Sequence, residues 1–216
     1  MKNRLARLLV RLGISADFLT AAGVLLSFYA AWLIALENLF AAGGVLLLSG
    51  LCDMLDGAVA RESAKQSAFG GILDSSLDRY GDGVVLGAVI IYYINFSQVQ
   101  YAVLAVSALL GSFAISYVRA RAECETDDCR VGFWERGERL VLIALALLVN
   151  HLTAALWVLG VGTHWTVFRR LAFAKIKIKN PSSKKIPFYL RASGRNTWPY
   201  FFKAAAIVGL VLFLPR

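Results

Sequence analysis

Four aspartates stand close together in an apolar part of the chain, in the stretch "CDMLDGAVARESAKQSAFGGILDSSLDRYGD". They are Asp53, Asp56, Asp74 and Asp78. An aspartate at membrane depth costs about 2.5–3.5 kcal/mol, and packed carboxylates repel one another unless cations lie among them. Oxygen ligands suit Mg²⁺ or Mn²⁺, and two such metals about 3.5–4 Å apart form a clamp for phosphoryl displacement. The stretch therefore predicts a two-metal site for phosphoryl chemistry.

The spacing of the aspartates places them on helix faces that can meet. At about 100° per residue, Asp53 and Asp56 lie about 60° apart on one face of a helix. Asp74 and Asp78 are four residues apart and form a stripe on the next helix, which Asp82 continues by one turn. The connecting loop is short, so the two acidic faces can face each other. Pairing with arginines or helix capping would explain one aspartate, but it explains four on facing stripes poorly.

The elements that carry these aspartates are predicted to cross a membrane. Apolar residues make up 58% of the 216 residues and charged residues 17%, against about 45–50% and about 25% in a soluble domain. Since a crossing takes about 20 apolar residues, we expect an all-α membrane protein with six transmembrane helices. The predicted spans cover residues 18–36, residue 40 to the first aspartates, 68–96, 101–118, 133–149 and 152–168.

The segments that flank these spans have a different character. The start, "MKNRLARLLVRLG", has arginines at helical spacing and no uninterrupted apolar stretch. It predicts an amphipathic juxtamembrane helix over residues 2–13 rather than a signal peptide. We expect a transmembrane domain over residues 1–172, followed by a basic cytoplasmic tail over 173–216 with a terminal apolar, interfacial helix. A seventh span and a segment that packs on a partner are the alternatives for this last stretch.

The basic residues predict the orientation in the cytoplasmic membrane. None of the 23 Lys and Arg lies between the first and second, third and fourth, or fifth and sixth spans. By the positive-inside rule, both ends of the transmembrane domain and the loops near 62–67 and 119–139 face the cytoplasm, together with the aspartates. The net charge of +9 is then that of a protein facing anionic membrane lipids, and we expect no nucleic-acid partner.

The aspartates belong to a longer pattern. It reads Asp53-x-x-Asp56-Gly57-x-x-Ala60-Arg61, then eight residues, then Gly70-x-x-x-Asp74-x-x-x-Asp78. This resembles the signature of the CDP-alcohol phosphotransferases, and the similarity extends over about residues 15–172. The resemblance implies a membrane enzyme, usually a homodimer, that transfers a phosphatidyl-type group from a CDP-linked lipid to an acceptor hydroxyl and releases CMP.

The resemblance also implies roles for individual residues. Asp53, Asp56 and Asp74 would hold two Mg²⁺ or Mn²⁺ ions, and Asp78 would be the general base and also contact a metal. The remaining positions would line the pocket for the CDP-linked donor: Gly57, Ala60, Arg61, Gly70 and, upstream, Thr20.

The start of the first span departs from the family. There the family often has Pro-Asn-x-x-Thr, and this chain reads "ADFLT". Thr20 is retained, whereas Ala16 and Asp17 replace the Pro-Asn pair.

The segment after the fourth span, "SYVRARAECETDDCRVGFWERGERL", is similar to one in phosphatidylinositol-phosphate synthases and their archaeal relatives. In those enzymes, basic residues at the positions of Arg119 and Arg139 bind the phosphate of the acceptor. Arg169 or Arg170 can complete the cluster with a bidentate contact to phosphate. The implied acceptor is a phosphorylated polyol, with inositol phosphate preferred and glycerol phosphate as the rival.

The same arginines and aspartates also fit less specific roles. These arginines, and Arg121 and Arg136 as well, are also at positions expected for ordinary juxtamembrane anchors. A divalent-cation transporter also carries aspartates in its membrane helices, but near the midplane rather than at one end of two spans. A catalytically silent scaffold would tolerate the loss of all four aspartates.

Overall fold

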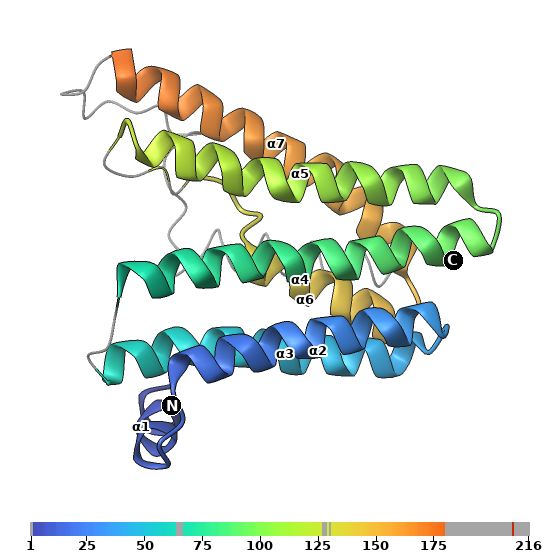
Figure 1. The fold of residues 1–216 in the computed structure, drawn as a ribbon. Coiled ribbons are helices and arrows are strands. Elements are labelled where there is room, and N and C mark those ends of the chain that lie inside the picture. Colours follow the sequence, from blue (N-terminus) through green and yellow to red (C-terminus); the bar gives the residue numbers. More distant parts are fainter. Residues whose placement is uncertain (1, 64–66, 127–128, 130, 180–208, 210–216) are drawn as a thin grey trace.

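The protein is a bundle of helices. The structure is a computed structural model that describes residues 2–63, 67–126, 129, 131–179 and 209, and within these residues it contains no strand. Helices α2 to α7 run in alternating, antiparallel directions along one axis, and α1 lies across the end where α2 begins (Figure 1). The expected all-α class is confirmed. The helices are α1 (Lys2–Arg11), α2 (Ala16–Ala35), α3 (Leu39–Glu62), α4 (Ala68–Asn95), α5 (Val99–Glu123), α6 (Arg136–Leu148) and α7 (Leu152–Lys179).

Serine caps fix the start of two helices at the end of the bundle that carries the aspartates. The Oγ of Ser15 accepts a hydrogen bond from the amide of Phe18 (3.2 Å) at the start of α2. The Oγ of Ser67 accepts one from the amide of Gly70 (2.9 Å), so α4 begins at Ala68 as predicted. A serine accepting from the amide three residues later satisfies a donor that has no partner in the helix.

Three turns of one kind connect the helices at the opposite end. They join α2 to α3, α4 to α5 and α6 to α7, and each contains one residue with a positive φ: Glu37 (63°), Ser97 (56°) and Asn150 (57°). In each turn the following amide bonds to the carbonyl five residues earlier, as Asn38 does to Leu33 (2.9 Å). This is the Schellman pattern of a helix end, and it closes three tight helical hairpins.

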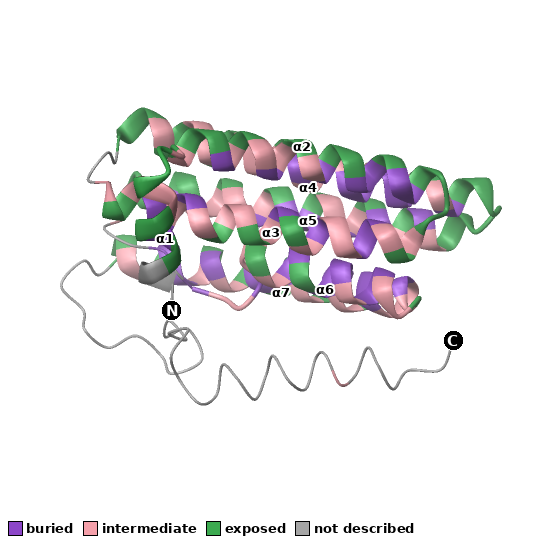
Figure 2. Cartoon of the chain, turned by 90° about the horizontal axis from the view of Figure 1, so that it is seen from below, coloured by how far each residue is buried: buried purple, intermediate pink, exposed green. Residues whose placement is uncertain are grey.

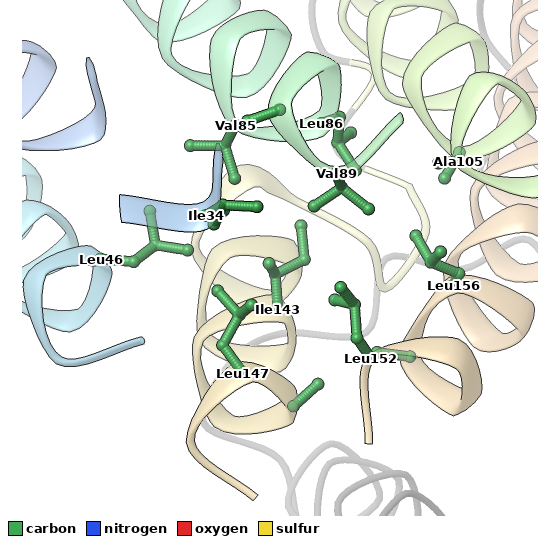
Figure 3. Close-up of a cluster of buried hydrophobic side chains, with 14 of the residues drawn as sticks. Ile34, Leu46, Val85, Leu86, Val89, Ala105, Ile143, Leu147, Leu152 and Leu156 are labelled. Carbon is green, nitrogen blue, oxygen red and sulfur yellow. The ribbon is translucent and has the colours of Figure 1, made fainter. Parts of the chain in front are cut away.

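The core lies between these hairpins. Ile34, Leu46, Val89, Ile143 and Leu156 are buried and come from five different helices (Figure 3). Helix α2 packs on α3 and α4, α3 on α6, α4 on α5, and α5 on α7. Helix α6 also packs on α7, so each of these six helices meets both its hairpin partner and a helix of another hairpin, which fixes α3 and α4 within the bundle.

The outer faces of the bundle are apolar. Exposed residues (green) follow the outward side of the helices in Figure 2, and Leu25, Phe40 and Val103 are each more than 60% exposed. A monomeric soluble protein rarely exposes apolar patches of this extent. Three helices, α2, α3 and α5, are long and apolar enough to cross a membrane. The chain is a membrane protein.

The other three predicted spans differ from these in charge or length. Helix α4 contains Asp74, Asp78, Arg79 and Asp82, and α7 contains two arginines and three lysines. Helix α6 has 13 residues and is therefore about 20 Å long at about 1.5 Å per residue, short of the roughly 30 Å hydrocarbon layer. Length and composition alone thus identify three spans among the described residues rather than six.

The predicted cytoplasmic tail lies largely outside the described residues. Of residues 173–216, the structure describes 173–179 and 209, so the predicted terminal apolar helix falls outside the described residues except for Gly209. Helix α7 continues without a break through residue 172 to Lys179. The end predicted for the transmembrane domain therefore lies inside a helix.

A pair of adjacent glycines tests the packing of α3 against α6. A Cβ on Gly43 would lie 2.8 Å from the carbonyl oxygen of Ala144 and 3.0 Å from the amide nitrogen of Leu148, whereas one on Gly44 would meet nothing within 4 Å. We expect Gly43→Ala to reduce the free energy of unfolding by about 1–3 kcal/mol, the usual cost of overpacking. Gly44→Ala should be neutral or stabilise by up to about 1 kcal/mol.

Thermal unfolding of the purified protein in detergent measures both variants. Both substitutions bring the same gain in helix propensity, so the difference between their unfolding midpoints reports the contact of position 43 with α6. Equal unfolding midpoints would show that α3 and α6 are not in close contact at Gly43.

Candidate active site

Three of the four aspartates meet at the junction of α3 and α4. One carboxylate oxygen from each of Asp53, Asp56 and Asp74 lies within 4.8 Å of the others, which confirms that the acidic faces of the two helices face each other. Asp78 lies one turn further along α4. Its Oδ1 is 2.6 Å from Nη1 of Arg136, and the same nitrogen contacts Asp53.

The donor set of this cluster fits a divalent metal ion. All three residues offer carboxylate oxygens, the ligands that Mg²⁺ and Mn²⁺ prefer. Asp56 is buried, and its two oxygens accept hydrogen bonds from the hydroxyl of Thr20 (2.8 Å) and from the amide of Gly57. The Oδ1 of Asp74 is buried and has no hydrogen-bond partner among the described residues. Such an atom is costly unless a cation or a hydrogen-bond donor satisfies it.

Arg136 is the cation that the aspartates share. It is the first residue of α6 and its side chain is 13% exposed. Its Nη1 contacts Asp53 and Asp78, and its Nε lies 3.8 Å from Asp82. Gly81 leaves room for it, since a Cβ there would lie 3.3 Å from Nη2 of Arg136. One guanidinium thus connects both acidic helices.

A second arginine of α6, Arg139, lies about one turn further along the helix than Arg136. Nη2 of Arg139 donates a hydrogen bond of 2.5 Å to Asp82, and Nη1 donates one of 3.1 Å to the carbonyl of Trp134. Its side chain is 4% exposed. The stripe on α4 therefore extends to Asp82 as the spacing allowed, but this carboxylate holds Arg139 and is not among the three that meet.

Two further arginines near the site, Arg170 and Arg119, differ in exposure. Arg170 is fully buried, and it donates hydrogen bonds to the carbonyls of Val131 (2.8 Å) and Ile115 (2.7 Å). It thereby fixes the segment between α5 and α6 against α7. Arg119 has a side chain that is 32% exposed, and its Nε donates to Glu123 (2.9 Å).

A cavity of about 890 Å³ opens beside the cluster. This volume is within the range of about 300–1,000 Å³ that is usual for ligand sites. Carboxylates of α3 and α4 and several arginines line the cavity together, so it suits a ligand whose phosphates contact both metals and arginines. The residues singled out from the sequence that line it are Asp53, Asp56, Gly57, Arg61, Asp74, Asp78, Arg119, Arg136, Arg139 and Arg170.

Six of the residues singled out from the sequence do not line this cavity: Thr20, Ala60, Gly70, Asp82, Arg121 and Arg169. The hydroxyl of Thr20 instead donates a hydrogen bond to Asp56. Gly70 donates its amide to the capping Ser67 in the first turn of α4.

The central position of Arg136 is the feature that sequence reasoning underestimates. By sequence alone it is one of several arginines that could bind phosphate or anchor the chain. A useful signal is present in "ERGERL": Arg136 and Arg139 are three residues apart, so they share one face of a helix. Two basic residues on one face are the natural complement of an acidic stripe such as that of Asp78 and Asp82.

Fold and site together define a membrane-embedded, metal-dependent phosphotransferase. The chain belongs to the CDP-alcohol phosphatidyltransferase family, whose model matches residues 14–172. The match includes every cavity-lining residue of α3, α4 and α6 named above, and it ends inside α7.

The chain is similar to several curated enzymes of known activity. It is 33% identical over 183 residues to archaetidylinositol phosphate synthase of Pyrococcus horikoshii, a match that covers 82% of this chain and 92% of the relative. It is also 33% identical over 178 residues to phosphatidylinositol phosphate synthase of Mycobacteroides abscessus, covering 78% and 81%.

The fold is shared with a solved enzyme. The crystal structure of Mycobacterium tuberculosis phosphatidylinositol phosphate synthase with CDP-DAG bound matches with a TM-score of 0.72 and 32% identity, over 81% of this chain and 93% of that one. The structure of the same enzyme in complex with manganese and citrate matches equally well, over 81% and 89%.

Proposed function

We propose that the protein transfers a phosphatidyl-type group from a CDP-linked lipid to a hydroxyl of inositol phosphate and releases CMP. The observation that carries this proposal is the three-aspartate cluster, which opens into a cavity that several arginines also line. CDP-DAG is bound in the solved mycobacterial relative, and the curated relatives named above are inositol phosphate synthases. The lipid of the donor is a diacylglycerol or its ether analogue.

The aspartates of α3 and α4 hold the metals in this proposal. Asp53, Asp56 and Asp74 are the first proposed ligands, and Asp78, one turn further along α4, would also contact a metal. Bound Mg²⁺ or Mn²⁺ would neutralise the diphosphate of the donor and stabilise CMP as it leaves. Gly57 and Arg61 line the adjoining wall and would contact the nucleotide, with Ala60 and Gly70 as further family positions on the same helices.

Asp78 is the proposed general base. Its carboxylate lies at the cavity and takes the proton of the acceptor hydroxyl as the hydroxyl oxygen attacks the phosphorus attached to the lipid. The bond between that phosphorus and the oxygen of CMP breaks, and CMP leaves. Arg79, whose Nη1 is 4.0 Å from Asp78, adds a positive charge beside this carboxylate.

Arginines that line the cavity together with the aspartates are the proposed site for the phosphate of the acceptor. Arg119 is the best placed, because it lines the cavity and its side chain is partly exposed. Arg139 and Arg170 also line the cavity, although several of their nitrogens already bond to Asp82 and to backbone carbonyls. We assign them mainly to positioning. Arg169 is not part of the lining and is the weakest of the four candidates.

The topology proposed from the sequence extends this assignment. Residues 1–172 would form one transmembrane domain of six spans in the cytoplasmic membrane, with the aspartates and both ends of the domain on the cytoplasmic side. Helix α1 packs on α3 through Ala6 and Val59, and would lie along the membrane surface. A homodimer and a cytoplasmic tail after residue 172 complete the proposal.

Release of CMP tests the proposed reaction. Purified protein is incubated with CDP-diacylglycerol and Mg²⁺ or Mn²⁺, with inositol phosphate, glycerol phosphate or free inositol as the acceptor. We expect CMP and a phosphorylated lipid product with inositol phosphate, and none after metal removal by EDTA. Faster release with glycerol phosphate would reassign the acceptor. No CMP with any polyol phosphate would contradict the reaction itself.

Thr20 offers a test of the metal assignment. Because its hydroxyl donates to Asp56, it orients one proposed ligand, and loss of such a partner typically costs about 10–100-fold in metal affinity. Thr20→Val should therefore weaken Mn²⁺ binding by at least about tenfold, as measured by isothermal titration calorimetry. Thr20→Ser keeps the donor and should stay near the wild type. Equal losses in both variants would show that the hydroxyl is not what matters.

A further inference from the structure

The contacts of Arg136 raise a conflict with the proposed metal site. Nη1 of this arginine contacts one oxygen of Asp53 and one of Asp78. Asp53 is one of the three proposed metal ligands, and Asp78 is the proposed base. A carboxylate oxygen that accepts from a guanidinium at contact distance has little room for a divalent metal on the same side. The arginine and the metal therefore compete for the same carboxylates.

Burial makes this competition strong. The side chains of Arg136 and Asp78 are 13% and 18% exposed, and that of Asp53 is 29% exposed. Charges in such surroundings are screened much less than charges at a free surface. Without a cation, the carboxylates of α3 and α4 would repel one another across a few ångströms. The guanidinium thus satisfies a requirement that the metal also satisfies.

We infer that Arg136 is an exchangeable counter-ion of the aspartate cluster. It holds Asp53 and Asp78 in the metal-free protein, and divalent metal displaces it from these carboxylates on binding. The inference rests on the proposed function, because it takes the metal ligands from there. It goes beyond that function by assigning a role in metal binding to Arg136, which lies outside the aspartate signature.

The exchange has a consequence for the reaction. While Arg136 holds Asp78, the carboxylate is paired and is a poor acceptor for the proton of a hydroxyl. If metal bound at Asp53 displaced the guanidinium, Asp78 would be released from this pair, and the guanidinium would be free at the wall of the cavity, where the anionic substrates are proposed to bind. Metal loading would therefore prepare the base and add a positive charge for the substrates at the same time.

Mn²⁺ affinity in the absence of lipid substrates tests the exchange. Calorimetric titrations compare the wild type with Arg136→Gln, Arg136→Lys and Arg121→Gln. Arg121 serves as the matched control, because it loses the same charge from an exposed position where it pairs with Glu125 (3.2 Å). We expect Arg136→Gln to bind Mn²⁺ at least about tenfold more tightly than the wild type, since a competing charge has been removed. Arg121→Gln should stay within about twofold.

The lysine variant separates competition for contacts from a general effect of charge. Lys keeps the charge but cannot offer the planar fork of Arg, so we expect its affinity to fall between those of the wild type and Arg136→Gln. An affinity of Arg136→Gln that is unchanged or weaker than that of the wild type would overturn the inference, because a residue that only positions the aspartates predicts a loss. If the wild type and all variants fail to bind Mn²⁺, the proposed metal site itself is wrong.

A second measurement on the wild type covers the case in which Arg136→Gln does not fold. The side-chain Nε resonances of ¹⁵N-arginine are recorded in detergent with and without Mg²⁺, and the signal of Arg136 is assigned by its absence in Arg136→Lys. We expect this signal to shift on addition of Mg²⁺, while that of the buried Arg170 stays in place. An Arg136 signal that does not move at saturating Mg²⁺ would overturn the exchange.

Discussion

Asp78→Asn is expected to lower turnover by about 10²–10⁴-fold, the range that a positioned general base contributes. The change keeps the shape of the side chain and removes its ability to accept the proton of the acceptor. Asp53, Asp56 and Asp74 remain to hold the metals, so binding of the CDP-linked lipid should be largely retained. The rate of CMP release and the equilibrium binding of the donor are the two measurements.

Asp82→Asn provides the comparison for this variant, one turn further along α4. Its carboxylate accepts from Arg139 and does not belong to the three-aspartate cluster. We expect this change to lower the unfolding midpoint and to reduce turnover much less than Asp78→Asn does. Near-native turnover of Asp78→Asn would refute its role as the base, and a parallel loss of donor binding would assign it to the metals instead.

Arg170→Gln is expected to reduce the free energy of unfolding by about 2–5 kcal/mol. The guanidinium donates to the carbonyls of Ile115 and Val131, and each buried carbonyl left without a donor costs about 1–3 kcal/mol. The segment between α5 and α6 would then lose its anchor on α7. Thermal unfolding and the yield of folded protein measure the effect.

Arg169→Gln is the neighbouring control, because it removes the same charge from a half-buried side chain on the same helix. We expect it to change the unfolding midpoint much less. Steady-state kinetics on Arg170→Gln separate the two roles considered for this residue. A higher KM for inositol phosphate at unchanged stability would show that Arg170 binds the acceptor and does not act as a structural anchor.

The positions of the aspartates could be predicted from the sequence because they depend on local geometry. The spacing of Asp53 and Asp56 fixes one helix face, and that of Asp74 and Asp78 fixes another. The short connection keeps the joined ends of α3 and α4 close together, and both helices pack on α2. Proximity in sequence therefore carried over to proximity in space.

The contacts of the arginines could not be predicted in the same way. Arg136 meets Asp53 across 83 positions in the sequence, and this contact depends on how α6 enters the bundle. The burial of Arg170 depends on the path of the segment that joins α5 to α6. Periodicity indicates which residues share a helix face, but it does not show which of several arginines is buried and which faces the cavity.

The three Schellman turns bear on how the chain enters the bilayer during synthesis. Each turn is too tight to let its two helices separate far, so in the proposed six-span topology each hairpin is expected to insert as a unit. This matters most for α6, which with 13 residues is too short to be retained alone. Helix α6 should insert stably only after α7 has been synthesised. Until then, the aspartates of α3 and α4 in the nascent protein would lack the arginine that neutralises them.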